Sequence, residues 1–189
     1  RGLDRLAELT ARWPGVSFST LVDSVDQVAE LPPGPGVFID VDLGMGRTGI
    51  GVSEGDEIRA IARAAGDRFR GLHAYDGHRH EADLDERARL IHASYDELVS
   101  LAGSLRDADL APSEVITAGP PAFPAALNHV GLATLPGSGH RVSPGTVVYP
   151  DLPSVEQLPD LAAGFAANVP PRVSGLPRTD RATAAPRST

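Results

Sequence analysis

Apolar residues along most of the chain follow two patterns that alternate. Leu3, Leu6, Leu9 and Trp13 recur at intervals of three or four, which places them on one face of a helix. The run from Val37 to Val41 is almost continuously apolar, as in a parallel strand buried on both faces. By these criteria the sequence predicts helices over residues 2–13, 24–31, 53–65, 83–105 and 121–128, and strands over residues 16–21, 36–43, 69–75, 115–117 and 145–149.

The alternation of strand and helix favours an α/β fold of parallel strands joined by right-handed crossovers. The spacing predicts a partial (β/α)8 TIM-type barrel over residues 1–152. After Pro153 the periodic pattern weakens. Residues 170–189 are rich in Pro, Arg, Ser and Thr and have few large apolar side chains, so the sequence predicts a tail that is disordered or weakly docked.

Composition narrows the class of partner. The 189 residues are 41% hydrophobic and 22% charged, as in a globular protein with a buried core. The formal net charge of −8 argues against a nucleic-acid surface and against attraction to anionic lipid, so a small-molecule ligand is favoured. No apolar run approaches the roughly 18 residues that span a bilayer, and no signal peptide is apparent, so we expect a cytoplasmic protein. Because cysteine is absent, a metal site would need histidine and carboxylate ligands.

Four predicted strand ends carry residues suited to binding, and in a parallel α/β barrel the chemistry lies at the carboxyl ends of the strands. The first is residues 38–50, where a buried strand leads into three glycines around Arg47. Glycines let the backbone approach a ligand, and the guanidinium offers a fixed charge to an oxyanion. A turn with a surface arginine is the alternative interpretation.

The second strand end is residues 71–78, with His73, Tyr75, Asp76 and His78. Alternation along a strand puts His73 and Tyr75 on the same face, so both are predicted to point into one pocket, where the aromatic ring would lie against a planar cofactor. In the alternative, Tyr75 fills the barrel and His78 caps a helix. The pair His78 and His80 resembles a metal motif, but only Glu81 lies nearby as a third ligand, so no metal site is predicted.

The third strand end, residues 115–124, has small residues before a helix start, an arrangement that often cradles phosphate with free backbone N–H groups. Its prolines remove some of these donors. The fourth, residues 142–151, is a tight turn before a predicted strand, and a structural turn is its simplest interpretation.

Taken in order, these segments resemble the D-threonine aldolase and D-serine dehydratase family, fold type III pyridoxal-phosphate enzymes related to the barrel of alanine racemases. The resemblance spans about residues 3–151, and GLHAYDGH and DVDLGMGRTGI are its most specific segments. Residues 153–169 resemble the family's crossing toward a C-terminal β domain. The resemblance therefore implies that the chain is a fragment of the family's length.

The resemblance also implies roles for individual residues. Arg47 would lie near the cofactor O3′ and the substrate, Tyr75 would pack on the pyridine ring, and His73 and His78 would line the substrate pocket. Phosphate and pyridine contacts would come from the third and fourth strand ends. These further cofactor-binding residues are Thr117, Gly119, Ser143, Gly145 and Thr146.

The implied activity is the retro-aldol cleavage of D-β-hydroxy amino acids to glycine and an aldehyde, with pyridoxal phosphate and a divalent metal such as Mn, Mg or Zn. D-serine dehydratase and amino-acid racemase activities are alternatives within the fold, and intact relatives are expected to be monomers or homodimers. All 17 basic residues are arginine, so no lysine is present to form the Schiff base and no catalytic residue is assigned. A non-catalytic protein that binds a phosphate-bearing ligand, and an enzyme assembled from two chains, therefore remain alternatives.

Overall fold

The computed structural model describes residues 2–145, 171–178 and 181–186. The chain divides into two compact units, residues 1–143 and residues 144–189, which are considered separately. The expected crossing segment, residues 153–169, and the last predicted strand beyond residue 145 lie outside the described residues. The candidate site is therefore built from the first unit.

The first unit contains a parallel sheet whose strands lie in the order β1-β2-β4-β5-β6, with the short strand β3 paired to β2. All five neighbouring pairs of strands are parallel. Parallel strands require a crossover between them, which the intervening helices provide. The strands are β1 (Ser19–Val22), β2 (Gly36–Asp42), β3 (Ile50–Gly51), β4 (Phe69–Ala74), β5 (Glu114–Thr117) and β6 (Gly139–Val142).

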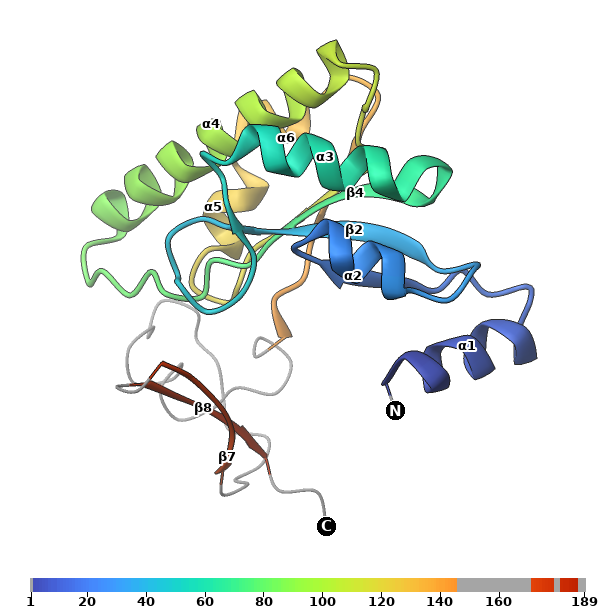
Figure 1. The fold of residues 1–189 in the computed structure, drawn as a ribbon. Coiled ribbons are helices and arrows are strands. Elements are labelled where there is room, and N and C mark those ends of the chain that lie inside the picture. The colour runs from blue at the N-terminus through green and yellow to red at the C-terminus, as the bar shows by residue number, and fades with distance from the viewer. Residues whose placement is uncertain (1, 146–170, 179–180, 187–189) are drawn as a thin grey trace. The chain divides into compact units, whose positions relative to one another are not determined.

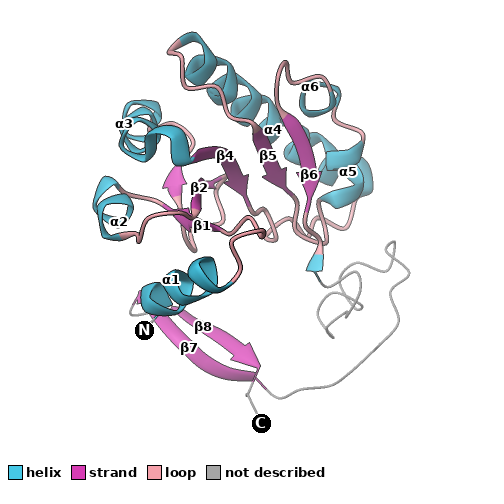
Figure 2. Ribbon diagram, turned by 90° about the vertical axis from the view of Figure 1, so that its right-hand side faces the viewer, coloured by secondary structure: helices cyan, strands magenta, loops and turns pink. Residues whose placement is uncertain are grey.

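Helices form an outer layer along the sheet, as Figures 1 and 2 show. Helix α3 packs on β2 and β4, while α5 and α6 pack on β6 and on the long helix α4. Side-chain caps begin two of these helices, Ser24 accepting from Gln27 N–H and Asp83 accepting from Glu86 N–H. The helices are α1 (Gly2–Arg12), α2 (Val25–Glu30), α3 (Gly55–Ala65), α4 (Leu84–Asp107), α5 (Phe123–Leu127) and α6 (Val130–Ala133), with one 3₁₀ turn, η1 (Gly66–Arg68).

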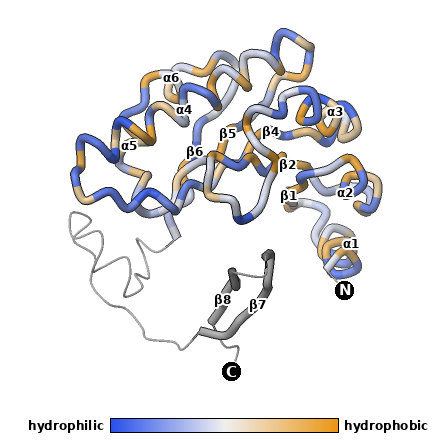
Figure 3. Tube along the Cα trace, turned by 60° about the vertical axis from the view of Figure 1, so that its left-hand side comes forward, coloured by the Kyte–Doolittle hydropathy of each residue, from blue (hydrophilic) through white to orange (hydrophobic). Residues whose placement is uncertain are grey.

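The core lies between the central strands and the helices. Figure 3 shows hydrophobic residues along β2, β4 and β5 and alternating hydropathy along the helices. The largest side chains in this core are almost completely buried, and Tyr95 is the largest of them. They are Tyr95, Ile39, Ile58, Ile61, Leu72, Ile91, Leu98, Leu105 and Leu132.

The register of the sheet decides which side chains share a face. Asp40 is paired with His73, His73 with Ile116, and Ile116 with Arg141, so these four residues form a row across one face. The next row along the strands alternates to the opposite face, because side-chain direction in a strand has a period of two. Thr117 belongs to this next row, paired with Ala74 on one side and Val142 on the other.

Most predicted elements are confirmed, and the partial α/β barrel with them. In the first unit the structure adds four elements that the sequence pattern did not predict, which are β3, η1, α6 and β6. Strand β6 covers residues 139–142, before the turn where a strand was expected to begin. Its exposure alternates between exposed and half-buried, so it lacks the apolar run by which β2 is recognised.

In the second unit, β7 (Pro171–Arg178) and β8 (Arg181–Pro186) pair in antiparallel register. The prediction that residues 170–189 form a disordered or weakly docked tail is not tested by this pairing. The pairing joins the two strands through backbone groups, which a search for large apolar side chains does not detect. Among the described residues, no helix has the length and apolar character needed to cross a membrane.

The end of α4 generates a stability prediction. Leu110 N–H donates to Leu105 O (2.9 Å) and Asp109 N–H donates to Arg106 O (3.0 Å), the bonding pattern of a Schellman motif. This motif places Asp109 at a φ of 61°, where glycine is the favoured residue. We expect Asp109→Gly to raise the free energy of unfolding by about 0.5–1 kcal/mol, measured by urea denaturation.

The matched control is Asp107→Gly, in the last turn of the same helix, where glycine should lower the stability by a few tenths of a kcal/mol. Two changes of the same sign would contradict the conformational explanation.

Candidate functional site

The loop after β2 is folded around one carboxylate. Asp42 Oδ1 accepts hydrogen bonds from the backbone N–H groups of Gly44 (2.9 Å), Met45 (2.8 Å) and Gly46 (3.1 Å). Successive N–H groups that converge on one anion fix the path of a loop that is otherwise rich in glycine. Asp42 thereby sets the position from which Arg47 extends.

Arg47 and Tyr75, predicted to share a site, are brought together. The guanidinium carbon of Arg47 lies 4.5 Å from the centroid of the Tyr75 ring, within the range of a cation–π contact. Arg47 comes from the loop after β2 and Tyr75 directly follows β4, and these two strands are neighbours in the sheet. Arg47 is exposed and Tyr75 is half-buried, so the pair forms an accessible wall at the carboxyl ends of the strands.

A histidine–carboxylate pair lies on the same two strands. His73 Nδ1 is 2.8 Å from Asp40 Oδ1, and Thr48 Oγ1 donates to Asp40 Oδ2 at 2.8 Å. An ionised carboxylate can only accept hydrogen bonds. His73 Nδ1 therefore carries the hydrogen and donates a hydrogen bond to Asp40. This tautomer leaves His73 Nε2 as the basic nitrogen, for which the described residues provide no hydrogen-bond partner.

The electrostatics of this pair favour an ionised Asp40. Burial by itself would raise the pKa of Asp40, but the hydrogen bonds from His73 and Thr48, with the nearby charge of Arg47, lower that pKa overall. Asp40 is 8% exposed, so the carboxylate is held almost completely inside the protein by these partners. It can therefore orient the imidazole as a fixed negative charge.

A second carboxylate, Asp76, joins three elements. Tyr95 Oη of α4 donates to Asp76 Oδ2 at 2.5 Å, and Gly119 N–H of the loop after β5 donates to Asp76 Oδ1 at 2.9 Å. Asp76 is 2% exposed. Burial raises its pKa in spite of these hydrogen bonds, and burial next to Asp76 raises the pKa of Tyr95 well above its ordinary value.

The loops after β4 and β5 are in direct contact beside Tyr75. A Cβ atom added to Gly119 would lie 2.8 Å from Gly77 Cα and 3.1 Å from Tyr75 Cε2, and one added to Gly77 would lie 2.4 Å from Tyr75 Oη. Side chains larger than hydrogen therefore do not fit at either position without movement of the backbone or the ring. The two glycines and Arg47 together fix the place of the Tyr75 ring.

Other predicted site residues are engaged within the sheet or lie outside the first unit. Thr117 is 1% exposed, and its hydroxyl shares a 2.8 Å hydrogen bond with His140 Nε2 on the helix-facing side of the sheet. Ser143 N–H donates to Thr117 O at 3.0 Å. Gly145 belongs to the second unit, and Thr146 lies outside the described residues. Thr117 and the Ser143 N–H are thus engaged within the sheet, and the roles of Ser143, Gly145 and Thr146 stay predictions.

His78 lies beside the loop after β2, since its Nε2 is 3.9 Å from a Cβ built on Gly44. Its Nδ1 is buried and has no hydrogen-bond partner. Burial, followed by the neighbouring charge of Arg79, lowers the pKa of His78, so the neutral imidazole is favoured. The part of the chain with defined placement contains no group of three or more histidine and carboxylate side chains that could hold a metal ion.

The sequence interpretation did not assign Asp40, Asp76 or Tyr95 to the site. A signal for Asp40 was present, because a carboxylate inside an otherwise apolar strand needs a buried partner. Asp76 stood out at the same strand end as Tyr75, but neither it nor Tyr95 gave a signal for the contact between them. Their contact joins residues 19 positions apart and depends on how α4 lies on the sheet.

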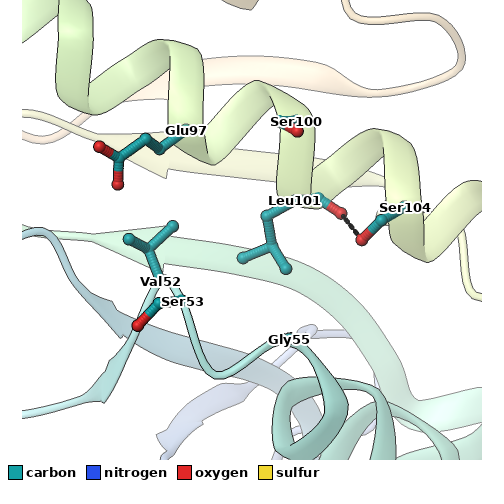
Figure 4. A pocket seen from close by; sticks show the side chains of 7 residues that line it. All are labelled: Val52, Ser53, Gly55, Glu97, Ser100, Leu101 and Ser104. Carbon is teal, nitrogen blue, oxygen red and sulfur yellow. Dashed lines mark hydrogen bonds between the residues drawn. The ribbon is translucent and has the colours of Figure 1, made fainter.

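A groove of about 320 Å³ lies apart from these residues, between α4 and the segment that leads into α3 (Figure 4). Val52 and Leu101 face one another across it, and Ser104 Oγ donates to the Leu101 carbonyl oxygen. None of its lining residues is a predicted site residue. The lining residues are Val52, Ser53, Gly55, Glu97, Ser100, Leu101 and Ser104.

Two comparisons of the sequence with known proteins gave different results. No model of a known protein family matches the chain. The chain is 28% identical over 123 residues to 3-hydroxy-D-aspartate aldolase from Paracoccus denitrificans, a match that covers 60% of this chain and 31% of that protein.

Three solved structures share the fold. D-threonine aldolase from Filomicrobium marinum has a TM-score of 0.70 at 24% identity, over 86% of this chain and 44% of that one. D-threo-3-hydroxyaspartate dehydratase from Delftia sp. HT23 has a TM-score of 0.62 at 25% identity, over 79% and 41%. An alanine-racemase-like protein from Idiomarina loihiensis has a TM-score of 0.61 at 23% identity, over 82% and 41%.

The resemblance predicted from the sequence is confirmed. The chain has the α/β fold of the D-threonine aldolase and D-threo-3-hydroxyaspartate dehydratase structures. It spans less than half the length of each of these relatives.

The resemblance implies pyridoxal phosphate, and the described residues fit one part of this cofactor. Tyr75 and Arg47 provide an aromatic ring and a cation at the strand ends, which suits a planar, anionic ligand. The phosphate side fits poorly, because Gly119 N–H is already bound to Asp76. The sequence also offers no lysine for the aldehyde. Tyr75 and Arg47 could therefore contact the planar ring of such a cofactor. Neither the Gly119 N–H nor a lysine is available to hold its phosphate and its aldehyde.

The Asp76 contact generates a stability prediction. Tyr95→Phe removes the hydroxyl that donates to a buried carboxylate, so we expect the free energy of unfolding to fall by about 1.5–3 kcal/mol. Tyr75→Phe is the control, since the described residues offer its hydroxyl no hydrogen-bond partner, and it should change stability by less than about 0.5 kcal/mol. Equal effects of the two variants in urea denaturation would contradict the assignment.

Asp40 generates a prediction about pH. Because its pKa is lower in the folded than in the unfolded protein, its ionisation contributes stability above the unfolded value of about 3.9, and that contribution is lost as pH falls through the lowered folded value. Asp40→Asn should therefore lower stability by about 1–3 kcal/mol at pH 6 and by progressively less below about pH 4. The exposed Asp26→Asn serves as control in pH-dependent urea unfolding. A deficit of Asp40→Asn that is independent of pH would refute the ionised pair.

Proposed function

We propose that this chain forms part of a pyridoxal-phosphate-dependent lyase that cleaves D-β-hydroxy amino acids to glycine and an aldehyde. The observation that carries the proposal is the Arg47–Tyr75 pair beside His73, at the carboxyl ends of the neighbouring strands β2 and β4. The relatives support the substrate class, because D-threonine and D-threo-3-hydroxyaspartate are both D-amino acids with a β-hydroxyl group.

Each of these side chains has a chemically distinct task in the proposal. When bound, pyridoxal phosphate supplies an electron sink for the charge left on the α-carbon as the Cα–Cβ bond breaks. Tyr75 orients the planar ring system, and Arg47 binds the anionic oxygens of the ligands with its planar guanidinium. His73 takes the proton of the β-hydroxyl at Nε2, since Asp40 holds the proton on Nδ1.

Dehydration of the same substrates is a second candidate, because D-threo-3-hydroxyaspartate dehydratase has the same fold. The two reactions differ in their products: cleavage releases an aldehyde and glycine, whereas dehydration releases ammonia and an oxo acid. A divalent metal to hold the β-hydroxyl is part of the proposal, with ligands supplied from outside the described residues.

The proposal predicts stereoselective chemistry that depends on the Arg47–Tyr75 wall. The 189-residue chain is incubated with pyridoxal phosphate, Mn²⁺ and either D- or L-threonine, and acetaldehyde and glycine are measured. Methylamine is included because the chain has no lysine to supply an amine. We expect cleavage above the background of cofactor alone, faster for the D-enantiomer, and reduced at least about tenfold by Arg47→Ala or Tyr75→Ala, since tenfold corresponds to only about 1.4 kcal/mol.

Arg63→Ala, on the exposed side of α3, is the matched control and should retain the wild-type rate. Equal rates with the two enantiomers, at the level of cofactor alone, would refute the proposed function for this chain. Release of ammonia in place of acetaldehyde would favour the dehydratase.

A further inference from the structure

The loop between β5 and α5 is the place where the sequence pattern suggested a phosphate site. From residue 119 to residue 124, each backbone position either donates its N–H to another group of the protein or is a proline without an N–H. Gly119 N–H donates to Asp76 Oδ1, while the N–H groups of Ala122 and Phe123 both donate to Gly119 O at 3.1 Å. The remaining three positions, 120, 121 and 124, are proline and have no N–H. A phosphate bound at residues 119–124 would find no free backbone donor.

The same loop is also closed sterically and electrostatically. A Cβ on Gly119 would lie 2.8 Å from Gly77 Cα and 3.0 Å from Gly77 N, so the loops after β4 and β5 touch at the point where a phosphate would need room. The Asp76 carboxyl lies at this contact, and any negative charge that it carries repels a second anion. Both of its oxygens are occupied, one by Gly119 and one by Tyr95.

We infer that Asp76 takes, within this chain, the backbone donor that a ligand phosphate would use, so that the loop after β5 is closed to phosphate groups. A phosphate-bearing cofactor must then be held by other residues. The inference goes beyond the proposed function, which concerns the pair Arg47 and Tyr75 and not the phosphate group.

The test follows the backbone amides of the ¹⁵N-labelled 189-residue chain by NMR during titration with inorganic phosphate, pyridoxal and pyridoxal phosphate. We expect the amide signals of Gly119, Ala122 and Phe123 to remain unchanged with inorganic phosphate, and to respond equally to pyridoxal and pyridoxal phosphate. A saturable shift of the Gly119 amide that requires the phosphate group would overturn the inference.

A pH titration identifies the acceptor directly. The groups that face Asp76 are Tyr95 from α4, Gly119 N–H from the loop after β5 and His78 from its own loop. The Gly119 amide shift should follow the Asp76 carboxyl, with a midpoint above the ordinary range because burial raises the pKa of Asp76. Asp76→Asn should abolish this response, and the exposed Asp26→Asn should preserve it. Persistence of the response in Asp76→Asn would also overturn the inference.

The outcomes separate this inference from the proposed function. Shifts at Tyr75 with pyridoxal phosphate, without a phosphate-dependent shift at Gly119, support both. An absence of shifts at Tyr75 with any pyridoxal compound counts against the proposed function alone, since Gly119 is then still closed to phosphate.

Discussion

The buried carboxyl group of Asp76 holds together the three elements on which the candidate site rests. It follows Tyr75 in the chain, accepts from Tyr95 on α4 and accepts from Gly119 after β5. A buried carboxyl without such partners is strongly unfavourable, so each of these contacts is needed for the others. Gly77 and Gly119 allow the two loops to touch beside the Tyr75 ring, and the guanidinium of Arg47 lies over that ring. These contacts within the protein fix the position of the Tyr75 ring.

The sequence pattern predicted the central elements of the fold because their apolar side chains are almost completely buried. Strand β2 is an apolar run with six of its seven residues buried, and α4 has both an Asp83 cap and an inward face of large side chains. Strand β6 gave no such signal, since it lies at the edge of the sheet and none of its residues is buried. The β7–β8 pair joins small and polar residues through backbone groups, a kind of pairing for which the hydrophobic pattern gives no signal.

The sequence could predict contacts in the candidate site only between residues that are close in sequence or that lie at the ends of adjacent strands. Arg47 and Tyr75 meet because β2 and β4 are neighbours, which the order of elements already suggests. Thr117 shows the opposite case. It ends a strand and has a hydroxyl group, but the register places it in the row of Ala74 and Val142, on the face that packs against the helices. A shift of one residue separates the two faces, and sequence patterns locate strand ends less accurately than that.

The distribution of contacts bears on how strongly this wall alone would hold a pyridoxal cofactor. Stacking on one aromatic ring is worth about 0.5–1.5 kcal/mol, and a cation–π or similar contact of a partly exposed arginine about 0.5–2 kcal/mol. Their sum falls short of the roughly 4 kcal/mol that corresponds to a millimolar dissociation constant. The two strong anchors of such a cofactor are a covalent bond to its aldehyde and several charge-assisted hydrogen bonds to its phosphate. This sequence has no lysine for the first, and Asp76 occupies the nearest donor for the second. In the proposed function these residues would therefore contribute orientation and proton transfer, and most of the affinity would have to come from groups outside the described part of the chain.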